Sequence, residues 1–142
     1  MILFCDTSAL IKLYIKEDGS ETVTAKLIES EGIAVCRIAW AEAIAAFSRR
    51  VRDVPEDAAV IEQAKAALTQ DWPNFIVMEV TQPLVERAGD YADTFALRGY
   101  DSVQLASAFE VGRVTESPIY FACFDIRLNK AASVLGMSCI NS

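Results

Sequence analysis

Short runs of apolar residues alternate along the chain with longer segments in which apolar residues recur every three or four positions. The first run covers residues 1–5 and ends at Asp6, and a similar run over residues 119–124 ends at Asp125. Unbroken apolar runs of this length, bounded by polar residues, are typical of strands buried on both faces of a parallel sheet. The pattern predicts two central strands, each followed by an aspartate at the carboxyl edge of the sheet, where open α/β sheets place their ligand sites.

Other segments continue this alternation of strands and helices. We expect Asp6 or Thr7 to cap the first helix, Gly99 to end a helix, and Asp101 to precede the next one. Further strands are predicted over residues 33–36, 75–78 and 137–140. Helices are predicted over residues 7–15, 20–30, 37–52, 55–70, 83–97, 102–112 and 126–135.

Strands that alternate with helices indicate an α/β fold, a three-layer α/β/α sandwich with a central, mostly parallel sheet and right-handed crossovers. A length of 142 residues predicts one domain over residues 1–142. The hydrophobic fraction of 53% suits a sheet covered by helices on both faces. No apolar run approaches the roughly 20 residues that span a bilayer, and no basic segment precedes the first run, so we expect a cytoplasmic protein without membrane association.

Composition narrows the possible chemistry. The chain has no histidine, which excludes Ser-His-Asp and Cys-His catalysis and histidine metal sites. The net charge of −7 argues against strong non-specific nucleic-acid binding but permits a local basic rim around an acidic centre. The four cysteines are far apart and are interpreted as small, buried, reduced residues: Cys5, Cys36, Cys123 and Cys139.

Four acidic residues stand out by position: Asp6, Glu42, Asp101 and Asp125. Each aspartate precedes a predicted helix, so each has an alternative role as an ordinary N-cap. Glu42 interrupts the apolar segment 38–47, where a carboxylate is costly to bury unless it is paired or bound to a cation. The alternative for Glu42 is an outward-facing position and an ion pair with an arginine on a following turn.

Considered together, the four acids suggest a cation site. Carboxylates that meet in one cleft repel one another, and their pKa values rise unless a cation neutralises them. Oxygen-only ligands suit Mg²⁺ or Mn²⁺, which keep several waters and bind phosphate oxygens. The residues therefore point to metal-assisted phosphodiester chemistry. This hypothesis requires the fold to bring the four acids together.

Four segments together resemble the PIN-domain nucleases, particularly the VapC-type toxins of bacterial and archaeal toxin–antitoxin pairs. They are FCDTSAL at residues 4–10, RIAWAE at 37–42, GYDSVQLA at 99–106 and CFDIRL at 123–128. Their order and spacing fit the family over nearly the whole chain. Many relatives have Ser or Thr where this chain has Ala39 and Cys123, a departure that concerns hydrogen bonds around the metal ligands rather than the ligands themselves.

The resemblance implies an endoribonuclease that depends on Mg²⁺ (or Mn²⁺), in which the metal lowers the pKa of a water that attacks the scissile phosphorus. A hydroxyl on Thr7 or Ser8 would orient the first carboxylate, and Asn129 would reach the site. The family's acidic quartet, catalytic and metal-binding, falls on Asp6, Glu42, Asp101 and Asp125.

The resemblance also implies an RNA substrate, a cognate antitoxin and a homodimer. Candidates for holding the RNA backbone are Arg37, Arg49, Arg50, Arg98, Arg127 and Lys130, with Lys12 and Lys16 at the rim of the cleft. For most of these residues a solvated surface position is the simpler interpretation. Apolar residues that could contact a partner, or could equally belong to the core, are Leu10, Ile11, Leu13, Tyr14, Leu27 and Ile28.

Two other functions are compatible with parts of the pattern. One is a PIN-fold module that binds RNA or protein without cleaving, although such a module would need no full set of four acids. The other is a phosphotransfer or receiver-like domain with Asp6 as phosphoacceptor. Haloacid-dehalogenase-type phosphatases need a second aspartate where this chain has Ser8, and receiver domains need an acidic pair and a strand-end lysine that are not visible here.

Overall fold

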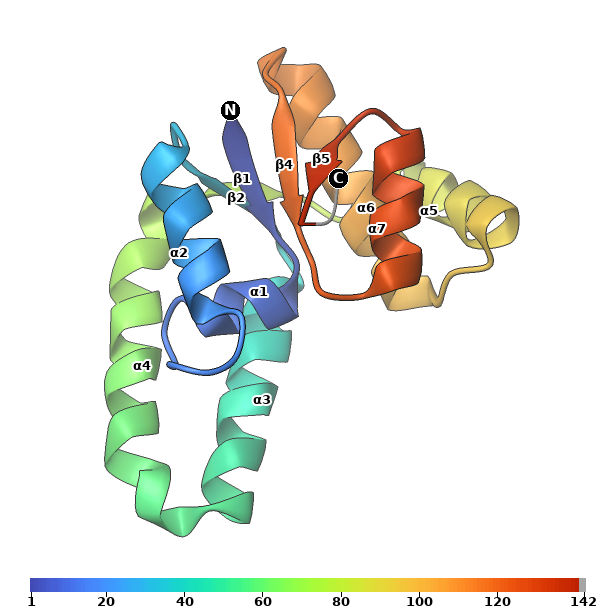
Figure 1. Cartoon of the computed structure of the whole chain (residues 1–142). Helices are drawn as coiled ribbons and strands as arrows, with labels where there is room; N and C mark the ends of the chain where they lie inside the picture. The colour runs from blue at the N-terminus through green and yellow to red at the C-terminus, as the bar shows by residue number, and fades with distance from the viewer. Residues whose placement is uncertain (141–142) are drawn as a thin grey trace.

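A computed structural model describes residues 1–140, which contain a single five-stranded sheet in the order β3-β2-β1-β4-β5. β1 (Ile2–Cys5) lies at the centre between β2 (Ile33–Cys36) and β4 (Ile119–Ala122), and β3 (Ile76–Met78) and β5 (Ser138–Cys139) are the edges (Figure 1). All four pairings are parallel. The predicted three-layer α/β/α fold is confirmed, and the sheet is parallel throughout.

Alternate residues of the central strand face two separate cores. Ile2 and Phe4 pack against the helices of one face, and Leu3 and Cys5 pack against those of the other. Because both faces are covered, β1 is fully apolar, as expected for a parallel sheet. The first face carries α5 (Gln82–Phe95), α6 (Gly99–Thr115) and α7 (Ile126–Val134). The second carries α1 (Thr7–Lys12), α2 (Ser20–Glu29), α3 (Ala39–Asp53) and α4 (Ala58–Asp71), with short 3-10 turns at η1 (Pro55–Asp57) and η2 (Trp72–Asn74).

Most helix boundaries differ from the prediction by one to three residues, and two of these differences have a visible cause. α1 ends at Lys12 rather than at residue 15, because the Leu13 and Tyr14 N–H groups bond carbonyls three residues back and tighten the last turn. α5 is ended by Ala96, whose φ of 54° is left-handed, and Gly99 begins α6 instead of ending α5. Asp101 therefore lies in the first turn of α6 and does not cap it, so the capping alternative for Asp101 is wrong.

The chain order places a switch point beside β1. The chain proceeds from β1 through β2 to β3 on one side, and then crosses to β4 and β5 on the other (Figure 1). In such sheets the crevice outside the carboxyl ends of the strands at the reversal is the usual ligand site. Asp6 follows β1 and Asp125 follows β4, so both aspartates lie at this position.

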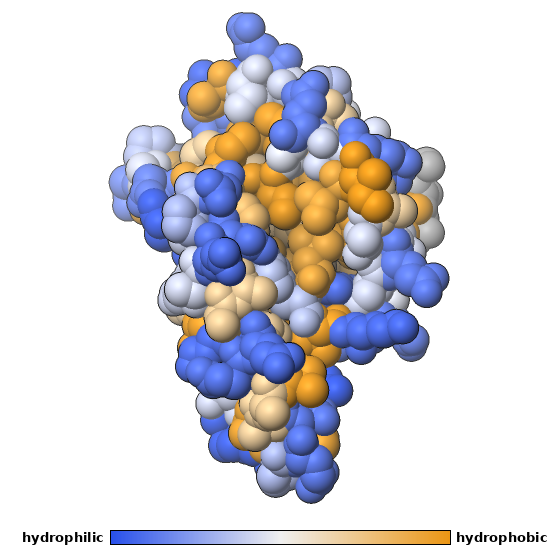
Figure 2. Space-filling view, turned by 90° about the vertical axis from the view of Figure 1, so that its left-hand side faces the viewer, coloured by the Kyte–Doolittle hydropathy of each residue, from blue (hydrophilic) through white to orange (hydrophobic). Residues whose placement is uncertain are grey.

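Most apolar residues of the first two helices belong to the core. Leu10 is fully buried, and Ile11, Leu13, Tyr14 and Leu27 pack against the core under α1–α4. Ile28 is the exception, with 79% of its surface exposed. Figure 2 shows the side of the molecule where α2 and α4 lie, and apolar side chains gather in its upper half between hydrophilic margins.

The four cysteines are buried and form no disulfide bond within residues 1–140, in agreement with the prediction. No helix within residues 1–140 is both long enough and apolar enough to cross a membrane.

Candidate active site at the carboxyl edge of the sheet

Asp6 follows β1 and caps α1. Its backbone is extended, and its Oδ1 accepts hydrogen bonds from the Ala9 N–H and the Ser8 hydroxyl, both at 2.9 Å. An N-cap aspartate satisfies one of the unpaired amides of the first helical turn. The capping role is confirmed, and because these bonds go to Oδ1, they are compatible with ligand binding through Oδ2.

Burial and a neighbouring charge raise the pKa of Asp6. Loss of hydration on burial is the largest cause, and the Asp101 carboxylate adds to it. Hydrogen bonds from Ala9, Ser8 and Cys123 lower the pKa and offset part of this rise. Ionised Asp6 therefore costs free energy in the metal-free protein, and a nearby cation would relieve that cost.

Glu42 is linked to two other helices. The Thr7 hydroxyl donates to Glu42 Oε1 at 2.6 Å, and Gln104 Nε2 donates to the same oxygen at 3.1 Å. Gln104 Nε2 also lies 3.3 Å from Thr7 Oγ1. Glu42 thus faces α1 and α6, and the alternative of an outward-facing ion pair with arginine is wrong. The two candidate hydroxyls have different partners, since Ser8 bonds Asp6 and Thr7 bonds Glu42.

Asp101 connects the acids electrostatically. Burial raises its pKa most, the Asp125 and Glu42 carboxylates raise it further, and the Arg98 guanidinium lowers it. Asp101 also raises the pKa of Asp6. The four acids come from four separate segments, and the fold brings Asp6, Glu42 and Asp125 within electrostatic range of Asp101.

Asp125 caps α7, as predicted, because its Oδ1 accepts from the Leu128 N–H at 2.9 Å. Cys123 connects this cap to Asp6. Its sulfur accepts from the Asp125 N–H at 3.2 Å, its thiol lies 3.8 Å from the Asp125 carbonyl, and its hydrogen bonding lowers the pKa of Asp6. Burial raises the pKa of the Cys123 thiol, so the thiol keeps the proton that this bond requires. Cys123 thus keeps a hydrogen-bonding group at this position, whereas Ala39, which is fully buried in α3, has no side-chain donor.

Two buried amides stand near the acids. Asn129 is 7% exposed and donates to the Cys123 carbonyl at 2.9 Å, so it supports the loop before Asp125 rather than an acid directly. Gln104 is 4% exposed and contacts Glu42. Within residues 1–140, the Gln104 Oε1 and Asn129 Oδ1 atoms have no hydrogen-bond partner. A buried acceptor without a partner costs about 1–3 kcal/mol.

Gln104 is the site residue that the sequence analysis missed. Its signal was weak but present: a lone amide among apolar residues, three positions after Asp101 on the same helix. Residues three apart lie on the same face of a helix, so this spacing predicts that Gln104 faces the same side of the helix as Asp101.

The basic candidates divide by location. Arg98 lies beside Asp101, and Lys12 lies 4.9 Å above the ring of Phe124, the residue before Asp125, while pairing with Glu17 at 3.0 Å. The other basic candidates pair with residues outside the site or are exposed to solvent. Arg37 pairs with Glu79, Arg50 pairs with Asp57 and Glu17, Arg127 donates to the Ala96 carbonyl, and Arg49, Lys16 and Lys130 are exposed.

The four carboxylates are ligands of the chemical type that a hard divalent cation prefers. Its potential ligands are carboxylate oxygens, the type that Mg²⁺ and Mn²⁺ prefer, and the pKa of both Asp6 and Asp101 is raised, mainly by burial and further by neighbouring acids. As the side chains stand, no three Asp, Glu or Cys residues among positions 1–140 form a group that could hold an ion.

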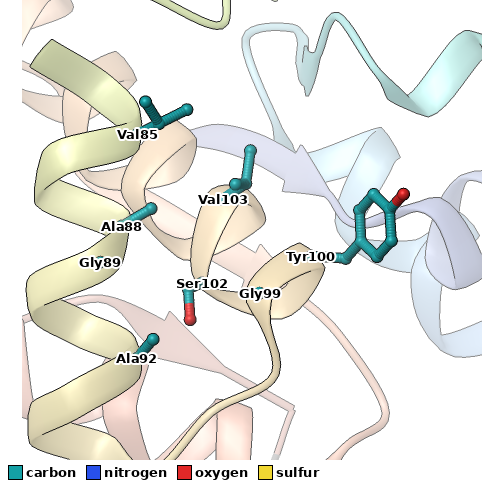
Figure 3. Close-up of a pocket in the computed structure, with 8 residues that line it drawn as sticks. All are labelled: Val85, Ala88, Gly89, Ala92, Gly99, Tyr100, Ser102 and Val103. Carbon is teal, nitrogen blue, oxygen red and sulfur yellow. The ribbon is translucent and has the colours of Figure 1, made fainter. Parts of the chain in front are cut away.

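A separate groove lies between α5 and α6. It has a volume of about 470 Å³, and its lining of small and apolar residues does not include the four acids. Figure 3 shows the side chains of Ala88 and Ala92 directed into this groove, while the Tyr100 ring points away from α5.

The structure defines a class: a parallel α/β/α domain with an acidic site at the switch point of its sheet. The sequence matches the PIN domain family over residues 3–132, and the chain belongs to that family. It is 32% identical over 139 residues to Ribonuclease VapC45 and to Ribonuclease VapC49, from two strains of Mycobacterium tuberculosis (CDC 1551 / Oshkosh and ATCC 25618 / H37Rv). Each of these matches covers 95% of this chain and 92% of the relative.

Solved structures share the fold at low sequence identity. VapBC2 from Rickettsia felis, bound to a DNA fragment from its promoter, aligns with a TM-score of 0.66 and 13% identity over 99% of this chain and 98% of that one. A toxin–antitoxin complex from Klebsiella pneumoniae aligns with a TM-score of 0.59 and 16% identity over 84% of each chain.

Proposed function

We propose that this protein is a Mg²⁺- or Mn²⁺-dependent endoribonuclease and the toxin of a type II toxin–antitoxin pair. The observation that carries the proposal is the position of Asp6 and Asp125 at the carboxyl edge of the sheet, with Asp101 close enough to interact electrostatically with Asp6, Glu42 and Asp125. The relatives named as VapC ribonucleases support RNA as the substrate.

Each proposed role follows from the contacts of the residue concerned. Thr7 and Ser8 hold the Glu42 and Asp6 carboxylates through one oxygen each. A bound divalent cation would supply the charge that activates a water and stabilises the leaving oxygen of the phosphodiester. The proposed ligands of that cation are Asp6, Glu42, Asp101 and Asp125.

The RNA backbone would approach from the rim beside the acids. Arg98 and Lys12 are the basic residues whose contacts place them there, next to Asp101 and Phe124. Arg37 and Arg127 would have to exchange their present partners for phosphate, and Arg49 is exposed two helical turns after Glu42.

A protein partner is part of the proposal. Solved relatives are toxin–antitoxin complexes, and the apolar area that Figure 2 shows on the side where α2 and α4 lie suits coverage by an antitoxin or by a second copy of this chain. The proposed location is the cytoplasm.

One observation favours the non-cleaving alternative. Among residues 1–140 the acids do not stand as a ready-made ion-binding group, and a PIN module that only binds RNA or protein would not need one. Cleavage by the purified protein decides between the two functions.

The decisive experiment incubates the purified protein with a mixed RNA pool in Mg²⁺, in Mn²⁺ and in chelator, alongside Asp6→Asn. The proposal predicts cleavage that requires the metal and disappears in the variant. Metal-independent cleavage, or equal cleavage by Asp6→Asn, contradicts the site. A folded, partner-free protein that binds Mn²⁺ but cleaves no RNA in the pool favours the non-cleaving module.

A further inference from the structure

We propose that Gln104 is a positioning residue, which fixes the orientation of the Glu42 carboxylate for the cation. This inference rests on the proposed function, because it concerns the same site. The observation behind it is the triangle formed by Thr7, Glu42 and Gln104, residues on three different helices.

The triangle determines which end of the Gln104 amide faces the acid. Thr7 has one hydroxyl proton, and at 2.6 Å that proton goes to Glu42 Oε1. Thr7 Oγ1 and Glu42 Oε1 can then only accept the bonds that link them to the amide. The amide must therefore present its NH₂ group to both, as observed at 3.3 Å and 3.1 Å. With both donors directed at Oε1, the second oxygen of Glu42 has a fixed direction.

Glutamine suits this role because it donates without carrying charge. A lysine at position 104 would neutralise Glu42 and compete with the cation, and a glutamate would add another negative charge to four that already repel. A leucine or methionine would fill the same space but leave Glu42 with Thr7 alone. A neutral donor orients the carboxylate and leaves its full charge available to a metal.

Stability alone does not explain a glutamine at this position. Gln104 is 4% exposed, and within residues 1–140 its Oε1 has no partner. An apolar side chain of similar shape would have no buried acceptor without a hydrogen-bond partner, and would avoid the cost of one. Glu42 is only partly buried, so water could replace the lost amide bond. The positioning role thus predicts that removing the amide harms metal binding without harming the fold.

The first test compares the wild type with Gln104→Met, which keeps the length of the side chain and removes both its donors. Mn²⁺ affinity is measured by titration calorimetry, and thermal unfolding is followed by circular dichroism in chelator. We expect the Kd for Mn²⁺ to rise about 10- to 100-fold, as is usual when a residue that orients a metal ligand is lost. We expect the melting temperature without metal to be unchanged or higher. Gln63→Met, on the exposed side of α4, is the matched control and should change neither quantity.

A second test asks whether Gln104 and Thr7 act through the same carboxylate. Thr7→Val removes the other donor to Glu42 Oε1, and it should also weaken Mn²⁺ binding. Because both residues hold one oxygen, the double variant Thr7→Val/Gln104→Met should lose less affinity than the two single losses combined. Additive losses would mean that the two residues act independently, which contradicts the triangle as the mechanism.

The outcomes separate this inference from the proposed function. A wild type that binds no Mn²⁺ refutes the metal site, and the inference with it. A wild type that binds Mn²⁺ with the same affinity as Gln104→Met refutes the positioning role alone. A variant that loses affinity and melting temperature together shows that Gln104 acts through packing, which also refutes the positioning role.

Discussion

Replacing Asp6 by asparagine should stabilise the metal-free protein. The substitution removes the buried charge but keeps the helix cap, because asparagine is as good an N-cap as aspartate, and its oxygen can accept the Ala9 and Ser8 bonds. The charge is unfavourable because burial and Asp101 raise the pKa of Asp6 above its ordinary value of 3.8. The variant avoids that cost, and its fold should remain intact.

The direction of the pH dependence follows from the raised pKa. Between pH 3.8 and the raised value, folded Asp6 holds its proton more tightly than the unfolded chain does. Wild-type stability therefore falls as the pH rises through this window, and the loss is complete above it. The gain from Asp6→Asn should be absent below pH 3.8 and should reach its maximum above the raised pKa.

Loss of the helix cap and loss of metal binding should change the free energy of unfolding by different amounts. Asp6→Ala also lacks the charge but loses the cap, so it should be about 1 kcal/mol less stable than Asp6→Asn. With an unfolding entropy of about 0.3 kcal/mol/K for a chain of this length, that difference is about 3 °C in melting temperature. A metal concentration of 100 times the Kd should raise wild-type stability by about 2.7 kcal/mol, or about 9 °C, and have little effect on either variant.

The assay is calorimetric unfolding from about pH 3 to pH 8, first in chelator and then in Mn²⁺. Asp93→Asn, which removes an exposed aspartate of α5, controls for the change in net charge. The reasoning fails if Asp6→Asn is less stable than the wild type at neutral pH, or if its gain is the same at every pH. An equal Mn²⁺ response in the wild type and Asp6→Asn would remove Asp6 from the metal site.

Other variants test the remaining contacts. Glu42→Gln can still accept the Thr7 hydroxyl, so it should fold and bind Mn²⁺ more weakly; an unchanged Kd in calorimetry would place Glu42 outside the site. Arg49→Ala changes an exposed side chain, so Mn²⁺ affinity should stay constant and RNA affinity, measured by fluorescence anisotropy, should fall slightly at most. Lost Mn²⁺ binding in that variant would mean that the face of α3 is misassigned. Gly19→Ala should cost at least about 1–2 kcal/mol in urea unfolding, because φ is +92° and the added Cβ would lie 2.7 Å from the Phe124 ring; an unchanged midpoint would contradict the strain.

The local pattern of apolar residues was sufficient to predict most strands and helices of the fold. The runs before Asp6 and Asp125 are strands, and the periodic segments between them are helices, because a covered parallel sheet demands continuous apolar strands. The local signal failed at the boundary between α5 and α6. Ala96 adopts the left-handed conformation expected of a glycine, and Gly99 begins the next helix, which moved Asp101 from a predicted cap into the first turn of α6.

The sequence by itself determined the chemistry that this protein has available: acids after two buried strands, a glutamate in an apolar helix, and no histidine. Tertiary structure alone decided which of these groups meet. Gln104 bonds Thr7 from 97 positions away and Glu42 from 62 positions away, and neither pairing is visible along the chain. The physical reason is that strand order in the sheet, a long-range property, places distant segments side by side, whereas local propensity and periodicity report only on near neighbours along the chain.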